Sequence, residues 1–218
     1  MSESECSSDI LYIVYHNILL IQYFFLLYIF IYFDKVMGLN SQFILDMISL
    51  YEFAVYFMLF MLSIATNNIY FLVLFIAIFS KQIPERILKA LSPKSINKRP
   101  DKAFNCDMIN QGGDASNRGG FPSGHCTFTS FIATYSVYIF VVSKNKKIKQ
   151  QITSIMIVSI LFAIIMPAVR YLKNCHTITQ TLAGFFLGIV WSGMFILLER
   201  EVLLKWSLYS RHRNKIWT

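Results

Sequence analysis

The stretch RGGFPSGHCTFTS, residues 118–130, stands at the start of an apolar run. Its glycine pair lacks Cβ atoms and lets the backbone approach a ligand closely. Pro122 suits the first turn of a helix, and Ser123 and Gly124 then lie among the N–H groups left unpaired at the helix start. Such a helix start binds phosphate, and His125 can exchange a proton with a bound group near neutral pH. The stretch therefore predicts a phosphate site; the alternative is a surface Ser-Gly turn beside an interfacial histidine.

Apolar runs account for most of the chain, and 56% of its residues are hydrophobic. Runs of roughly 20 such residues are long enough to cross a bilayer as helices. Six occur, at 10–33, 48–66, 69–87, 122–143, 152–172 and 176–199. Only Asn67 and Asn68 separate the second run from the third, which predicts a tight helical hairpin. We expect an all-α fold, an integral membrane bundle of six transmembrane helices.

No internal repeat, low-complexity tract or second soluble domain is visible, so residues 1–218 are predicted to form a single membrane domain. The motifs of the site fall within 88–199, and the first two helices, 10–66, are expected to be peripheral. The polar start of the chain lacks a basic region before the first run. We therefore expect that run to remain as a membrane helix rather than a cleaved signal.

The net charge is +8, which we interpret as the flanking charge of a membrane protein, with no nucleic-acid partner. Basic residues at 144–149 and after residue 199 fall on one side of the predicted bundle. Arg170, Lys173 and the basic residues of the long loop fall on the other, where some are expected to hold phosphate. The interpretation places both termini in the cytosol and the site on the non-cytosolic side of the endoplasmic reticulum or plasma membrane.

Four cysteines fit neither a zinc pattern nor a CxxC redox pair: Cys6, Cys106, Cys126 and Cys175. Cys106 and Cys175 fall on the same predicted side, where an oxidising compartment would allow a disulfide. Free thiols are the favoured interpretation of the sequence.

Two further polar stretches lie at the ends of predicted helices, KSINKRPD at 94–101 and VRYLKNCH at 169–176. Following the chain across the bilayer puts both on the same side as 118–130. The residues gathered there are Arg99, Ser123, His125, Arg170 and His176, with Lys89, Lys94, Lys98 and Lys173 nearby. Singly, each has a structural explanation, such as snorkelling to headgroups or helix packing. Together they indicate a functional site, because ionisable groups at membrane depth are costly.

The chemistry of these side chains suits phosphoryl transfer. Two arginines, Arg99 and Arg170, can neutralise the oxygens of a transferring phosphoryl group. Of two histidines, one can attack phosphorus and the other protonate the departing oxygen. Gln180 lies four residues after His176 on the same helix face, where its oxygen can accept the other ring N–H.

The three motifs resemble the signature of the type 2 phosphatidic-acid phosphatase and haloperoxidase superfamily. They are Arg99-Pro100, the tetrapeptide Pro-Ser-Gly-His at 122–125, and Arg170 with five residues before His176. The resemblance implies that His176 forms a phosphohistidine and that His125 is the general acid. It implies that Arg99, Arg170, Ser123 and the Gly124 N–H hold the phosphate oxygens. It also implies a six-helix membrane bundle and hydrolysis with no metal and no cofactor.

Three positions depart from the family pattern. The family usually has a lysine where this chain has Ser92, and of the neighbouring lysines we favour Lys94 over Lys89 as the phosphate ligand. The serine usual before the second arginine is Val169, and the usual aspartate four residues after the nucleophile is Gln180. Glutamine there, in the stretch HTITQTLAG, resembles the dolichyl-diphosphatase branch.

These features predict an integral membrane phosphatase that hydrolyses a lipid-linked phosphate or diphosphate, of polyisoprenyl diphosphate or phosphatidic-acid type. We expect no metal requirement, since Asp101, Asp107 and Asp114 are spread along the loop. One alternative is a weak or inactive scaffold that binds phospholipid, suggested by Ser92 and Gln180. Another is a phosphotransferase that passes a headgroup from one lipid to a second alcohol.

Overall fold

The computed structural model describes residues 41–109, 112–143 and 146–217, and every regular element within them is a helix. The all-α prediction is confirmed for these residues. The chain divides into two compact units, Met1–Met47 and Ile48–Thr218. The first predicted run, 10–33, and Cys6 lie outside the described residues. The helices are α2 (Ser41–Ser49), α3 (Tyr51–Thr66), α4 (Ile69–Phe79), α5 (Gln82–Leu91), α6 (Lys94–Asn97), α7 (Gly124–Val142), α8 (Lys146–Leu172), α9 (Ile178–Glu201), the 3-10 turn η1 (Leu203–Lys205) and α10 (Ser207–Trp217).

Four helical segments of the described residues are long and apolar enough to cross a membrane. They are Ile44–Thr66, Gly124–Val142, Ile152–Leu172 and Ile178–Lys205. By length and composition these four agree with the predicted membrane protein, whereas the predicted total of six spans is not confirmed.

The predicted single helix over 69–87 is wrong, because the chain breaks at Ser80 and Lys81 between α4 and α5. Pro84 supplies the reason: it has no N–H for the carbonyl of Ser80, and its ring would clash with that carbonyl in a continuous helix. Ile83 N–H donates to the Ser80 carbonyl instead, at 3.0 Å. The break leaves Lys81 buried inside the bundle.

The helical hairpin predicted at Asn67 and Asn68 is confirmed. Asn67 ends α3 in the left-handed conformation, with φ of 45°. Asn68 caps α4, since its side-chain oxygen accepts a hydrogen bond from Tyr70 N–H at 3.0 Å.

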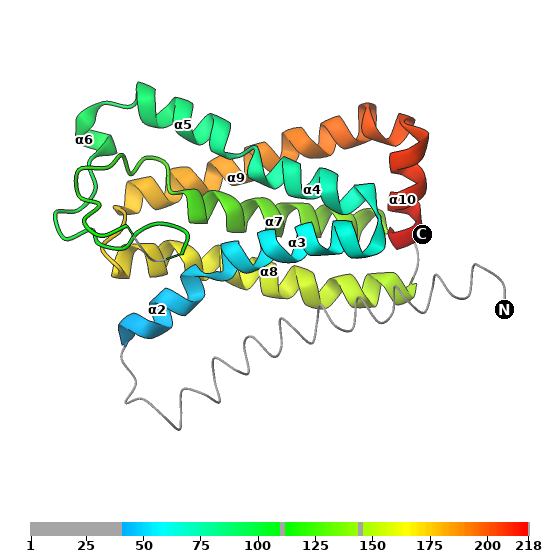
Figure 1. The fold of residues 1–218 in the computed structure, drawn as a ribbon, viewed down its shortest axis with the longest axis horizontal. Helices are drawn as coiled ribbons and strands as arrows, with labels where there is room; N and C mark the ends of the chain where they lie inside the picture. The colour runs from blue at the N-terminus through cyan, green and yellow to red at the C-terminus, as the bar shows by residue number, and fades with distance from the viewer. Residues whose placement is uncertain (1–40, 110–111, 144–145, 218) are drawn as a thin grey trace. The chain divides into compact units, whose positions relative to one another are not determined.

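Helix α7 lies between α8 and α9 along the bundle (Figure 1). Close packing of α9 on α7 depends on two glycines one turn apart. A Cβ on Gly184 would collide with the backbone of Ser123, and one on Gly188 with Ser130 and the backbone of Thr127. Glycine at these positions lets α9 approach the start of α7 closely, which brings two parts of the predicted site together.

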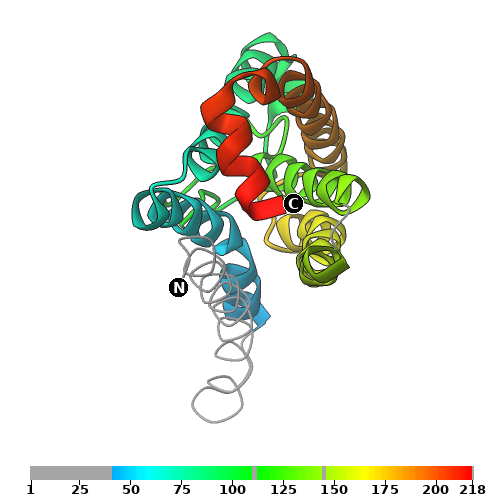
Figure 2. The ribbon, with the colours of Figure 1, turned by 90° about the vertical axis from the view of Figure 1, so that its right-hand side faces the viewer.

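A buried ionic cluster holds the C-terminal helix α10 across the other end of the bundle (Figure 2). The Glu199 carboxylate is fully buried and accepts hydrogen bonds from Arg213 Nε at 2.8 Å and from Tyr209 OH at 2.9 Å. Tyr135 OH, from α7, lies 3.2 Å from both carboxylate oxygens. Because its partners satisfy both oxygens, the buried charge is compensated.

Candidate functional site

The three polar stretches meet at one end of the bundle, where α5 and α8 end and α7 and α9 begin (Figure 1). Backbone hydrogen bonds tie them together. Ser123 N–H donates to the Gln180 carbonyl at 3.0 Å, and Gly120 N–H donates to the Asn97 carbonyl at 2.7 Å. The structure therefore brings the three predicted motifs together.

Helix α7 begins at Gly124 with Ser123 as its N-cap, so the expected place of Pro122 in the first turn is wrong by two residues. Pro122 instead precedes the cap, after a cis peptide bond. The shift follows from the bond between Ser123 N–H and α9, which ties the backbone of Ser123 outside the helix. The free N–H groups of the first turn still lie at Gly124 and His125.

His176 lies in the short turn between α8 and α9, and its ring nitrogens are chemically distinct. Nδ1 lies 2.9 Å from the carbonyl oxygen of Gly120 and 3.3 Å from the side-chain oxygen of Gln180. Both neighbours are acceptors, so Nδ1 carries the proton and Nε2 keeps its lone pair. Burial, reinforced by the positive charges of Arg170, Arg99 and Lys89, holds the pKa of His176 well below its ordinary value of 6.5. At neutral pH the ring is therefore a neutral imidazole with a nucleophilic Nε2.

Gln180 is fully buried and does more than face His176. Its side-chain oxygen accepts a hydrogen bond from Thr177 N–H at 3.2 Å, and its backbone N–H donates to Thr177 Oγ1 at 3.3 Å. These two bonds form a capping box. Its amide nitrogen donates to the carbonyls of Ile96 and Lys98, at 2.8 Å and 2.9 Å. An aspartate could accept from Thr177 but could not donate to those carbonyls. Glutamine thus ties the start of α9 to the backbone just before Arg99.

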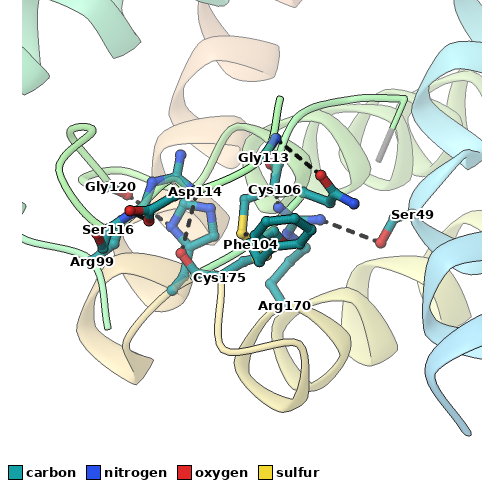
Figure 3. Close-up of a disulfide and its surroundings, with 12 residues drawn as sticks. Ser49, Arg99, Phe104, Cys106, Gly113, Asp114, Ser116, Gly120, Arg170 and Cys175 are labelled. Atoms are coloured by element: carbon teal, nitrogen blue, oxygen red, sulfur yellow. Dashed lines mark hydrogen bonds between the residues drawn. A yellow bond between two sulfur atoms is a disulfide. The ribbon is translucent and has the colours of Figure 1, made fainter. Parts of the chain in front are cut away.

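The two arginines lie on either side of a disulfide between Cys106 and Cys175 (Figure 3). The interpretation of these two cysteines as free thiols is wrong, because the fold brings residues 69 positions apart to a Cα–Cα distance of 5.4 Å. Arg170 is fully buried and donates to the Cys106 carbonyl at 2.6 Å and to Ser49 Oγ at 3.3 Å. Arg99 donates to the Cys175 carbonyl at 3.2 Å. Burial, with a smaller effect from Arg118, lowers the pKa of Arg99 to about 10, so its guanidinium stays charged at neutral pH.

Three buried polar atoms of the predicted site have no hydrogen-bond partner among the described residues. They are Ser123 Oγ, His125 Nε2 and Arg170 Nε. Unpaired buried polar atoms are rare because each costs free energy. Their concentration at the start of α7 and the end of α8, beside His176, indicates a position for a polar, anionic ligand.

The lysines near the site differ in their surroundings. Lys94, the expected phosphate ligand, is exposed at the start of α6. Lys89 is half-buried at the end of α5 and interacts electrostatically with His176, Glu85 and Arg99. Burial lowers the pKa of Lys89. The structure therefore places Lys89 close enough to interact with His176, whereas Lys94 is exposed.

Sequence analysis missed three buried charged residues beside His125, namely Glu52, Lys81 and Glu85. The Glu52 carboxylate lies 3.7 Å from His125 Nδ1 and 2.8 Å from Lys81 Nζ. Ser49 and Glu52 both fall within 10–66, the region expected to be peripheral. The signal was available in the sequence, because charged residues inside apolar runs are costly and mark functional positions.

Comparison with known proteins identifies one family. The model of the PAP2 superfamily matches residues 67–202, more than half of the chain, and this range contains all three motifs. No curated protein matches the chain, and no solved structure matches it.

Proposed function

The chain belongs to the PAP2 superfamily, and on that basis we propose that it hydrolyses a lipid-linked phosphate or diphosphate through a phosphohistidine. Membership in this superfamily and the apolar helices indicate a membrane phosphatase. The observation that carries the proposal is His176, a neutral imidazole whose Nε2 keeps its lone pair, near side-chain atoms of Ser123, His125 and Arg170 that lack a partner among the described residues. This arrangement suits attack on a bound phosphoryl group.

In the first half of the proposed reaction, the Nε2 lone pair of His176 attacks phosphorus. The P–O bond to the lipid breaks, its electron pair stays on the departing oxygen, and that oxygen takes a proton from His125 Nε2. In the second half, His125 Nε2 removes a proton from a water molecule as the water oxygen attacks phosphorus. The P–N bond then breaks and inorganic phosphate leaves.

Electrostatic stabilisation of the phosphoryl oxygens is assigned to Arg99, Arg170, Ser123 Oγ and the Gly124 N–H. We add Lys89 to this set in place of Lys94, because Lys89 is half-buried and interacts with His176. In this role Lys89 would act in place of the lysine that the family usually has where this chain has Ser92.

The proposed substrate is a polyisoprenyl diphosphate, with phosphatidic acid as the second choice. Gln180 within the stretch HTITQTLAG, 176–184, supports the dolichyl-diphosphatase-like branch. The buried amide of Gln180 shows that this departure from aspartate is built into the fold, since its two donated hydrogen bonds need glutamine.

The Cys106–Cys175 disulfide supports an orientation for the site. Disulfides persist in oxidising compartments and are rare in the cytosol. We propose that the catalytic end faces the non-cytosolic side of an endomembrane or the plasma membrane.

Phosphate release by the purified full-length protein in detergent and excess EDTA tests the proposal. The substrates are a polyisoprenyl diphosphate, phosphatidic acid and glucose 6-phosphate, with His176→Ala as the matched variant. We expect activity that survives the chelator and is lost in the variant, with the isoprenyl substrate preferred. Folded wild-type protein without activity would support the scaffold alternative, and a headgroup appearing on an added alcohol would support the phosphotransferase.

A further inference from the structure

We propose that Glu52 positions His125 for proton donation, and that Lys81 and Glu85 hold Glu52 in place. This inference deepens the proposed function and rests on it, because it concerns the acid of the same reaction. None of the three residues belongs to the motifs at 94–101, 118–130 and 169–176. They come from α3, from the break between α4 and α5, and from α5.

Lys81 is the centre of the cluster and its ammonium group is fully paired. Nζ lies 2.8 Å from Glu52 Oε1 and donates to Glu85 Oε1 and to the Gly124 carbonyl, both at 3.1 Å. Three acceptors match the three donors of a lysine. Because Gly124 precedes His125, Lys81 fixes both the backbone beside that histidine and the carboxylate that faces its ring.

Glu52 uses its two oxygens for different partners. Oε1 binds Lys81, and Oε2 lies 3.7 Å from His125 Nδ1. This distance suits an ion pair with a protonated ring, and catalytic contacts of this kind often shorten when substrate binds. With Nδ1 facing a carboxylate, the other nitrogen, Nε2, has no hydrogen-bond partner among the described residues and is available to the leaving group.

Glu52 places a negative charge beside the ring of His125. Two carboxylates and one ammonium leave a net charge of about −1, which an imidazolium would neutralise. Positively charged groups also face His125, namely Arg170, Lys173 and Lys81, together with the neutral ring of His176. A bound phosphate dianion would offset those positive charges, so substrate and Glu52 together favour the acid form. After the proton passes from Nε2 to the leaving oxygen, the neutral ring can keep its Nδ1–H toward Glu52.

Dependence on the leaving group tests this role. One probe is dodecyl phosphate, whose leaving alkoxide needs protonation. The other is a nitrophenyl phosphate that carries the same alkyl chain on its ring, and its leaving phenolate does not need protonation. The measured quantity is kcat/KM, which covers only the steps through departure of the leaving group. For Glu52→Gln we expect a loss of about 10- to 100-fold on dodecyl phosphate and less than about threefold on the nitrophenyl ester. The alkaline limb of the pH profile should move to lower pH.

The matched control is Glu199→Gln, which also neutralises a buried, ion-paired carboxylate but at the opposite end of the bundle. It should lower thermal stability and change kcat/KM on the two substrates by the same factor. An equal loss on both substrates in Glu52→Gln, or no loss, would overturn the proposal.

Glu52→Asp decides the question if Glu52→Gln does not fold. It keeps the charge beside Lys81 but withdraws the carboxylate from His125 by one methylene. We expect a smaller loss of kcat/KM, still confined to dodecyl phosphate. Wild-type kcat/KM on both substrates would overturn the proposal. Failure of the proposed function and failure of this inference give different results. Inactive wild-type protein refutes the phosphatase function itself. Active wild type with inactive His176→Ala and unselective Glu52 variants refutes only this inference.

Discussion

Arg170 donates a hydrogen bond to the carbonyl oxygen of Cys106 at 2.6 Å, inside the bundle and away from solvent. The other half-cystine, Cys175, accepts a bond from Arg99. One covalent link therefore fixes the backbone acceptors of both arginines (Figure 3). Because Cys175 also precedes His176, the disulfide holds the proposed nucleophile in the same frame.

Loss of this disulfide should weaken both stability and phosphate binding. Closing a loop of 69 residues contributes about 4 kcal/mol in the chain-entropy model. We expect the double variant Cys106→Ser/Cys175→Ser to unfold at lower temperature and to show a raised KM. Reductant should have the same effect on wild type and none on the double variant. A wild-type enzyme whose KM and melting temperature ignore complete reduction would contradict this.

Lys89 and Lys94 should differ when each is replaced by methionine. Lys89 is half-buried near His176, whereas Lys94 is exposed. A charged hydrogen bond is worth about 1.5–3 kcal/mol, so Lys89→Met should lower kcat/KM by roughly 10- to 100-fold. Lys94→Met should stay within about twofold of wild type, measured on the same substrate. The reverse order of effects would restore Lys94 as the phosphate ligand.

Restoring the family's usual aspartate at Gln180 should harm this protein. Gln180→Asp removes both donors to the Ile96 and Lys98 carbonyls and places a carboxylate near them. Each unsatisfied buried carbonyl costs about 1–3 kcal/mol. We therefore expect a lower melting temperature and at least about a tenfold fall in kcat/KM. A faster enzyme of unchanged stability would mean that the acidic partner of His176 matters more than the amide clamp.

The pH dependence should reflect the lowered pKa of His176. Only the neutral ring can attack, so activity should persist below pH 6.5, the ordinary value for histidine, before its acid limb begins. The lowered pKa of His176 also makes the folded protein less stable at acidic pH. Below about 6.5 the unfolded chain binds a proton at this position that the folded chain does not, so the free energy of unfolding falls as pH falls.

Thermal unfolding of wild type and His176→Gln between pH 7.5 and pH 5 measures this contribution. Each protein is compared with its own stability at pH 7.5. The wild type should lose more stability across the acidic range than the variant. Parallel curves would show that His176 titrates normally in the folded protein.

The sequence determined the local chemistry of the site because that chemistry resides in short motifs at helix ends. The apolar runs located α3, α7, α9 and the membrane-spanning part of α8 to within a few residues, since length and hydropathy suffice for a helix in a bilayer. Periodicity alone did not reveal the break at Ser80, although Pro84 carried the signal. The pattern Thr177-x-x-Gln180 likewise carried a signal for the start of α9, a capping box, which the sequence analysis did not use.

Beyond the three motifs, only the tertiary structure decided which distant groups meet. The disulfide, the position of Lys89 and the ion pair of Glu52 with Lys81 all join residues far apart in the chain, and no local pattern specifies such pairs. The role of Gln180 changed for the same reason. Its hydrogen-bond acceptors, the carbonyls of Ile96 and Lys98, belong to another part of the chain and become visible only when the loop folds against α9.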